Sequence, residues 1–112
     1  MGEMNVENLA KGVILYPKGY LDKIFGEEIL GKAGQLAKEG CKTIVLSFRD
    51  CPIVNSTGMA KLIELIELAG DREIELWFAD LSNLHHQTFE AAGMLGLIQK
   101  TTTAGDAKTL LI

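Results

Sequence analysis

Ser56 is the residue of this chain with the clearest chemistry, because it stands where an apolar segment gives way to a strongly helical one. Small hydroxyl and amide side chains occupy Asn55, Ser56 and Thr57, directly before the helical run that begins at Met59. At such a junction a side-chain oxygen accepts a hydrogen bond from the unpaired N–H groups of the first helical turn. Ser56 and Thr57 are therefore candidate helix caps.

A second interpretation makes Ser56 a phosphoacceptor. A phosphoserine carries nearly two negative charges, and here it would lie beside the positive end of the helix dipole. The fold should tolerate such a mark, so its effect would fall on whatever docks at this surface. The residues by themselves leave both interpretations open.

Two motifs extend the second interpretation. Asn55-Ser56-Thr57-Gly58-Met59 resembles the Asp-Ser-Ser/Thr-Gly-Leu motif of the STAS domain family, the bacterial anti-sigma factor antagonists. Gly19-Tyr20-Leu21-Asp22 is similar to the Gly-x-Leu-Asp motif that closes the second strand in that family and lies near the phosphorylated serine. Both motifs occur in the family's order, in a chain of the family's length.

The resemblance implies a function for Ser56. In the family, a partner anti-sigma factor that is also a serine kinase phosphorylates the matching serine, and a serine phosphatase would reset it. The unphosphorylated antagonist binds the anti-sigma factor and so releases the sigma factor. By the same resemblance, we expect the partner-binding residues to be Asp22, Asn55, Ser56, Thr57, Gly58 and Met59.

Asn55 departs from the family pattern, which usually has aspartate there, and Met59 replaces the usual leucine. Methionine for leucine nearly conserves volume, whereas asparagine for aspartate removes a charge beside the acceptor. An alternative function therefore stays open, in which the chain is a STAS scaffold subunit of a signalling assembly and Ser56 is not switched.

Enzymatic alternatives find little support in the residues. Ser56 as a nucleophile would need a base and an oxyanion hole, and its surroundings are not a Gly-x-Ser-x-Gly elbow. No Walker-type phosphate loop occurs, and an acidic cluster of the response-regulator kind is missing at Tyr16-Pro17-Lys18. His85 and His86 are adjacent, so on a helix they point about 100° apart and cannot readily share a metal. We expect both to be exposed, and we expect neither a cofactor nor a metal site.

Composition limits the partners. The 112 residues predict one domain, spanning 1–112, and 47% of them are hydrophobic. A net charge of −4 argues against nucleic acid, which requires a basic face. No signal peptide or membrane-length apolar run is found, so we expect a cytoplasmic protein that binds protein rather than membrane. Cys41 and Cys51 are expected to be reduced thiols.

The periodicity predicts an α/β domain with a mixed, mostly parallel sheet in the order β-β-α-β-α-β-α-β-α, which is also the STAS order. Met4–Leu9 and Val13–Tyr16 should form a hairpin. Asp22 should cap a helix that ends before Gly40. The remaining expected elements are strand 43–48, helix 59–69 with a stop at Gly70, strand 74–79, a helix capped at Ser82 or Asn83, strand 97–101 and a closing helix capped by Thr103.

Overall fold

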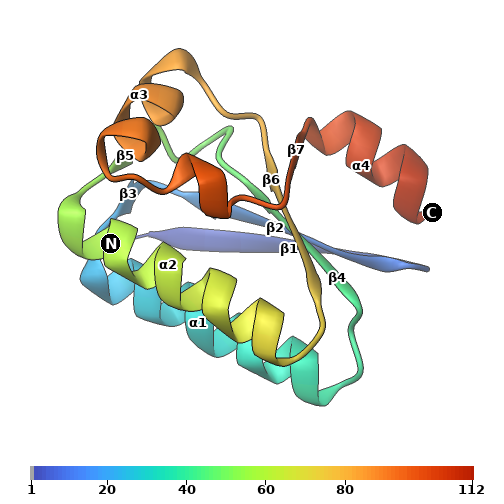
Figure 1. Cartoon of the computed structure of the whole chain (residues 1–112). Coiled ribbons are helices and arrows are strands. Elements are labelled where there is room, and N and C mark those ends of the chain that lie inside the picture. Colours follow the sequence, from blue (N-terminus) through green and yellow to red (C-terminus); the bar gives the residue numbers. More distant parts are fainter. Residues whose placement is uncertain (1) are drawn as a thin grey trace.

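The central sheet has the strand order β1-β2-β4-β6-β7 in the computed structural model, which describes residues 2–112 (Figure 1). Its strands are β1 (Glu3–Leu9), β2 (Gly12–Lys18), β4 (Thr43–Ser47), β6 (Glu75–Ala79) and β7 (Lys100–Thr102). The opening hairpin pairs β1 with β2 antiparallel, and the remaining neighbours in this sheet are parallel. The predicted mixed, mostly parallel sheet is confirmed.

Strand β4 lies in the middle of the sheet, as its apolar run predicts. Every residue from Thr43 to Ser47 is buried. Alternate side chains enter two different cores, because successive residues of a strand point to opposite faces. Ile44 and Leu46 belong to the larger core, and Val45 belongs to the smaller one.

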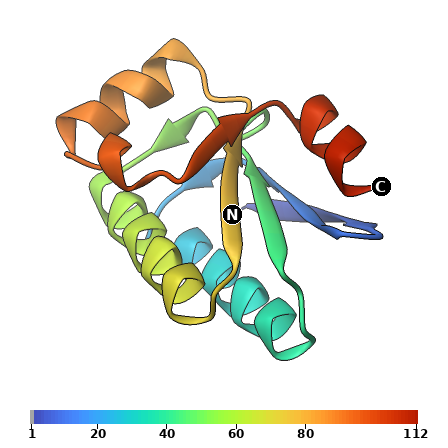
Figure 2. The ribbon, with the colours of Figure 1, turned by 45° about the vertical axis from the view of Figure 1, so that its right-hand side comes forward.

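Helices cover both faces of the sheet unequally (Figures 1 and 2). Helices α1 (Lys23–Lys38) and α2 (Ser56–Asp71) run side by side over the face that carries the larger core. Helix α3 (Asn83–Ala91) contributes Phe89 to the same core. On the other face, α4 (Ala104–Leu111) packs Ala107 and Leu111 against Ile14, Val45 and Trp77.

A second, two-stranded sheet was not predicted. Strand β3 (Tyr20–Leu21) pairs in parallel with β5 (Ile53–Val54), with Tyr20 opposite Ile53 and Leu21 opposite Val54. Strands of two residues are too short to show an alternating pattern, so only the tertiary contact reveals them. This small sheet brings the two sequence motifs together at one end of the molecule.

The boundaries of α2 and of the last strand differ most from those expected. Helix α2 begins at Ser56, earlier than Met59, and continues through Gly70 to Asp71. The chain turns after it at Glu73, which adopts a left-handed φ of 57°. The last strand is Lys100–Thr102 rather than 97–101, because Leu95–Leu97 form a 3-10 turn, η1.

The expected exposure of the two histidines is wrong for His85. Its side chain is only 3% exposed, whereas His86 is exposed. A lone sequence gives no sign of this, because the burial depends on the way α3 lies against the end of β4. The ring of His85 lies 5.2 Å from that of Phe48.

Candidate functional site

Helix α2 is capped by Asn55, so Ser56 is not its cap. Asn55 has an extended backbone, and its Oδ1 accepts a hydrogen bond of 2.7 Å from the backbone N–H of Gly58. Asparagine is among the best N-cap residues, so the signal was present in the sequence. The prediction from the sequence named only its two hydroxyl neighbours, Ser56 and Thr57, as candidate caps.

The two hydroxyls that follow Asn55 have different surroundings. Thr57 Oγ1 donates a hydrogen bond of 2.9 Å to the same Oδ1 of Asn55. Ser56 is exposed, and within residues 2–112 its hydroxyl takes part in no hydrogen bond. The structure therefore leaves the Ser56 hydroxyl free at the first residue of α2, where N–H groups of the first turn and the helix dipole favour a negative group.

Asp22 directly follows β3, the strand that pairs with the segment leading into Ser56. Its Oδ1 accepts a hydrogen bond of 2.9 Å from Phe25 N, which confirms the predicted cap of α1. The backbone N–H of Asn55 donates to the carbonyl of Leu21 at 3.1 Å. The start of α1 and the start of α2 thus lie at the same end of the molecule, with Asp22 and Asn55 each partly exposed.

Gly58 and Met59 lie beneath the surface where the starts of α1 and α2 meet. Gly58 is buried, and a Cβ built on it would overlap the backbone carbonyl of Leu21. Met59 is 5% exposed and belongs to the larger core. Of the expected partner-binding residues, Asp22, Asn55, Ser56 and Thr57 are open to solvent at least in part, whereas these two shape the surface from beneath.

A groove of about 370 Å³ opens beside Ser56, between α2 and α3. We call it the Ser56 groove. It is lined by Val54, Asn55, Ser56, Met59, Ala60, Ile63, Thr88, Ala91 and Ala92. Sequence reasoning missed the α3 wall, because no local pattern shows which face of α3 will meet α2.

Large apolar side chains are exposed in the neighbourhood of Asp22. Tyr20 is 50% exposed and Ile53 is 46% exposed, and these two are paired neighbours in the small sheet. Ile24, in the first turn of α1, is 67% exposed. Large apolar residues gathered beside polar ones are typical of surfaces that bind other proteins.

Lys61 lies one turn and a half beyond Ser56, and its charge is already paired. Its Nζ is 2.8 Å from a carboxylate oxygen of Glu64 and 3.9 Å from one of Glu27 on α1. The hydrogen bond to Glu64 raises the pKa of Lys61. This lysine therefore joins α1 to α2.

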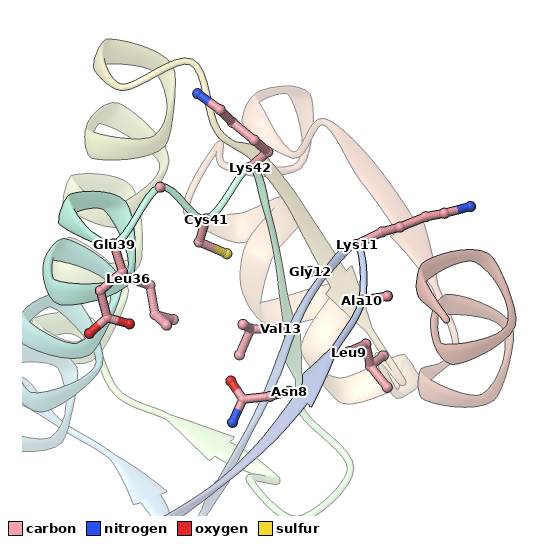
Figure 3. Close-up of a pocket in the computed structure, with 11 residues that line it drawn as sticks. Asn8, Leu9, Ala10, Lys11, Gly12, Val13, Leu36, Glu39, Cys41 and Lys42 are labelled. Atoms are coloured by element: carbon pink, nitrogen blue, oxygen red, sulfur yellow. The ribbon is translucent and has the colours of Figure 1, made fainter.

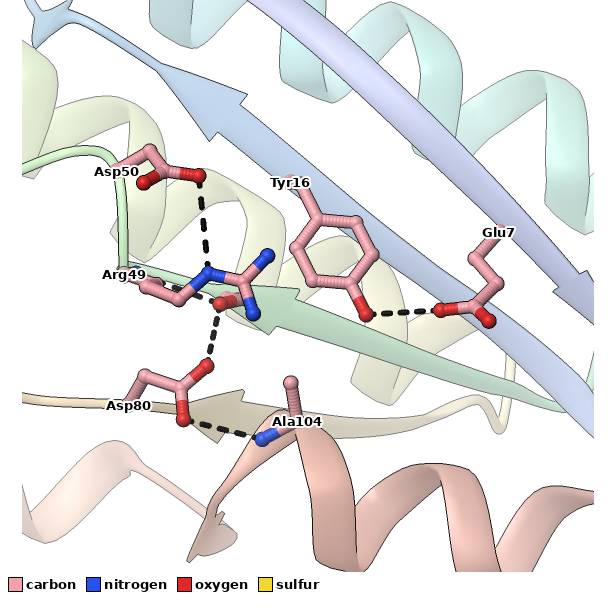
Figure 4. A network of polar contacts seen from close by, with 7 residues as sticks. Glu7, Tyr16, Arg49, Asp50, Asp80 and Ala104 are labelled. Carbon is pink, nitrogen blue, oxygen red and sulfur yellow. Dashed lines mark hydrogen bonds and ion pairs between the residues drawn. The ribbon is translucent and has the colours of Figure 1, made fainter.

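A separate polar network lies near α4, on the face of the sheet that α1 and α2 do not cover (Figure 4). Asp80 accepts hydrogen bonds from Ser47 Oγ at 2.6 Å and from Ala104 N at 3.1 Å. Tyr16 donates a hydrogen bond of 2.8 Å to Glu7, and the Arg49 guanidinium lies 4.9 Å from the Tyr16 ring centre. Each of these contacts joins one element to another, so the network holds α4 and the strand ends together.

A second hollow, of about 350 Å³, lies at the far end of α1 (Figure 3). Cys41 is its one thiol among Asn8, Leu9, Lys11, Val13, Leu36, Glu39 and Lys42. The Cys41 Sγ donates to the carbonyl of Thr43 at 3.3 Å, and burial raises the pKa of the thiol. The raised pKa favours the thiol of Cys41 over the thiolate, which is the reactive form.

Cys41 and Cys51 are both free thiols, as expected. Across residues 2–112, no three His, Cys, Asp or Glu side chains are arranged to hold a metal ion. None of the helices in the described part of the chain is long and apolar enough to cross a bilayer.

Comparison with known proteins agrees with the fold. The family model of the STAS domain matches residues 3–107. A sequence comparison with curated proteins gives no significant match.

Solved structures resemble the whole chain at low sequence identity. An anti-sigma factor antagonist from Mycobacterium paratuberculosis aligns with a TM-score of 0.80 and 14% identity, over 99% of this chain and 94% of that one. The Bacillus cell fate determinant SpoIIAA, in its phosphorylated form, aligns with a TM-score of 0.73 and 17% identity, over 98% and 100%. A sulfate transporter family protein from Wolinella succinogenes aligns with a TM-score of 0.76 and 19% identity, over 88% and 82%. At these identities the likeness establishes the fold, which proteins of more than one function share.

Proposed function

Since this chain belongs to the STAS domain family, we propose that it is an anti-sigma factor antagonist. Its unphosphorylated form binds an anti-sigma factor that is also a serine kinase, and this binding releases a sigma factor. Phosphorylation of Ser56 by that kinase ends the binding, and a serine phosphatase restores it. The protein acts as a regulatory binding module and not as an enzyme, and it works in the cytoplasm.

The observation that carries this proposal is the free hydroxyl of Ser56. Asn55 Oδ1 receives both the helix N–H of Gly58 and the hydroxyl of Thr57. Capping is thereby complete without Ser56, which is exposed and available to a kinase. Thr57 is the less suitable acceptor, because its hydroxyl is engaged in a hydrogen bond. Two of the structural neighbours named above are described as an anti-sigma factor antagonist and as a phosphorylated form, which supports a phosphorylation-dependent antagonist in general.

The surface around Ser56 supports protein binding. Exposed Tyr20, Ile24 and Ile53 offer apolar contact, and the Ser56 groove offers a second apolar contact beside the serine. Asp22 and Asn55 form a polar boundary between the two. We propose that Asp22, Asn55, Ser56 and Thr57 contact the partner directly, and that Gly58 and Met59 support them from within.

A phosphate on Ser56 acts on this contact through its charge. In the complex, a dianion at Ser56 would be desolvated between two protein surfaces, close to the carboxylate of Asp22. In the free protein, the same charge is solvated and lies at the positive end of α2, which it stabilises slightly. Phosphorylation thus lowers partner affinity and leaves the fold intact.

The test compares three baits in lysate of the native organism: wild type, Ser56→Ala and Ser56→Asp, with the captured proteins identified by mass spectrometry. An ATP-binding anti-sigma kinase held by the first two and lost from the third is the expected result. The purified kinase should then phosphorylate wild type and Thr57→Ala but not Ser56→Ala. Capture of the same proteins by all three baits would contradict the switch.

The second candidate function is a STAS scaffold subunit whose Ser56 is never switched. It is favoured by Asn55, which lacks the negative charge that the family usually places beside its serine. A phosphopeptide spanning Asn55 to Lys61 in protein isolated from the host would exclude this alternative. Its absence under all growth conditions, together with a stable multiprotein complex, would establish it.

A further inference from the structure

His85 is a buried polar residue that the proposed function does not use. It lies in the first turn of α3 and is 3% exposed, with its ring 5.2 Å from that of Phe48 and 6.0 Å from that of Phe89. Among residues 2–112 it takes part in no ion pair. A buried imidazole without a charged partner is retained in a core only when hydrogen bonds satisfy its nitrogens.

Both ring nitrogens of His85 are satisfied, and their partners fix the tautomer. The backbone N–H of Ser82 lies 3.0 Å from Nδ1, and because an amide N–H only donates, Nδ1 must accept. The proton therefore resides on Nε2, which donates to the carbonyl of Cys51 at 2.8 Å. His85 is thus a neutral ring with one nitrogen turned to its own helix and the other to a distant loop.

The two hydrogen bonds connect different parts of the site. The Ser82 side chain caps α3 by accepting from His85 N at 3.2 Å, so the Nδ1 bond belongs to the helix start. The Nε2 bond reaches the loop between β4 and β5, and Cys51 lies four positions before Asn55. One side chain therefore ties the start of α3 to the segment that leads into α2.

This tie fixes one wall of the Ser56 groove relative to the other. Thr88, Ala91 and Ala92 form the α3 wall, and Val54, Asn55 and Ser56 form part of the facing wall. The loop that carries Cys51 enters β5, whose last residue is Val54. A change in the contact between His85 and Cys51 is therefore transmitted to both walls.

We propose that His85 is a positioning residue for the Ser56 site, which sets the separation of α2 and α3 by donating from Nε2 to the carbonyl of Cys51. Its consequence for partner affinity rests on the proposed function, whereas the positioning itself does not. In the proposed role, His85 contacts neither the partner nor the phosphate.

Two substitutions separate the loop contact from the cap. Glutamine in the variant His85→Gln carries an amide N–H at about the reach of Nε2, and glutamine at this position also suits a capping box. Asparagine in His85→Asn is too short to reach Cys51, although it keeps a polar group near Nδ1. Leu111→Ala, on the opposite face of the sheet, serves as a control for general loss of stability.

The experiment measures amide hydrogen exchange by NMR in the free protein. In His85→Asn, exchange at the Asn55 and Gly58 amides should accelerate at least about tenfold relative to wild type, because the segment loses its anchor. His85→Gln should remain within about twofold of wild type. In Leu111→Ala we expect no local acceleration at these two amides. Nitrogen spectra of the wild-type imidazole should place the proton on Nε2.

Partner binding gives the second measurement. With the captured kinase, His85→Asn should bind about tenfold more weakly than wild type, and His85→Gln about as well as wild type. Exchange at Asn55 and Gly58 unchanged in both variants, or accelerated equally in both, would overturn the positioning proposal. So would a proton on Nδ1. If exchange behaves as expected and no anti-sigma kinase binds any form, the proposed function fails and the positioning stands.

Discussion

The backbone N–H of Asn55 donates a hydrogen bond to the carbonyl of Leu21, with 3.1 Å between nitrogen and oxygen. This bond joins the last residue of β3 to the cap of α2, and so it joins the two motifs found in the sequence. It places Asp22 and Ser56 at one end of the molecule. Because the two segments approach each other so closely, position 58 has no room for a side chain.

Gly58→Ala should destabilise the protein by about 2–3 kcal/mol, because the added methyl group would overlap the Leu21 carbonyl, which is backbone and cannot rotate away. Gly31→Ala is the matched control: it lies in a helix with no atom within 4 Å of the added Cβ. That change should stabilise by up to about 1 kcal/mol. Urea unfolding of both variants gives the two free energies. Equal effects of the two substitutions would refute the close approach.

Asn55→Ala should lower the free energy of unfolding by about 1 kcal/mol, because Gly58 N and Thr57 Oγ1 both lose their acceptor. Asn55→Asp keeps an acceptor and adds a charge at the positive end of α2, so its stability should match or exceed wild type. Thermal unfolding of the three proteins at low salt makes the comparison. A strong loss of stability in Asn55→Asp would argue against Asn55 as the cap.

Asp80→Ala should cost about 2–3 kcal/mol of stability. The buried Ser47 hydroxyl and the N–H of Ala104 both lose a charged acceptor, and Asp80 also adopts a left-handed φ of 61° that alanine disfavours. In Asp80→Asn an acceptor oxygen remains and the backbone is tolerated, so about half of that loss is expected. Denaturant titration measures both. The account of the network is wrong if alanine and asparagine are equally well tolerated.

Because of Tyr16, the free energy of unfolding should depend on pH in the alkaline range. Burial, together with the hydrogen bond to Glu7, raises its pKa to about 12, above the value near 10 of an unfolded chain. Between these values the folded state holds a proton that the unfolded state has lost. The stabilisation is therefore complete below about pH 10 and declines as pH rises toward 12.

The free energy of unfolding of wild type should consequently fall by about 1–2 kcal/mol more than that of Tyr16→Phe between about pH 9 and 11.5. Denaturant titrations at several pH values measure the difference. Other groups titrate in the same range, and the phenylalanine variant cancels their contribution. Parallel curves for the two proteins would show that Tyr16 ionises as an ordinary surface tyrosine.

Long periodic elements of this fold could be predicted from the sequence, whereas short or contact-dependent ones could not. The nearly continuous apolar run from Thr43 to Ser47 indicates a strand buried on both faces, because a strand with one solvated face would alternate apolar and polar residues. Strands β3 and β5 have two residues each, and nothing in two residues distinguishes a strand from a loop. Their pairing exists because Leu21 and Val54 meet in the folded chain.

The same distinction between local patterns and tertiary contacts applies to the candidate site. Ser56 and Asp22 could be singled out because their motifs are local in the chain. The prediction of Ser56 or Thr57 as the cap was wrong, because Asn55 is equally capable of capping and only the folded backbone shows that it receives the N–H of Gly58. The groove wall from α3 and the burial of His85 depend on contacts between segments about 30 residues apart, which a local pattern does not encode.

The most direct test of the proposed switch is the affinity of the anti-sigma kinase for the chain with and without a phosphate on Ser56. Phosphoserine is incorporated at position 56 during synthesis, and both forms are titrated into the kinase by calorimetry at physiological salt. We predict tight binding of the unmodified chain and binding at least about 100-fold weaker for the phosphorylated one, with similar melting temperatures. Equal affinities for the two forms would contradict the account.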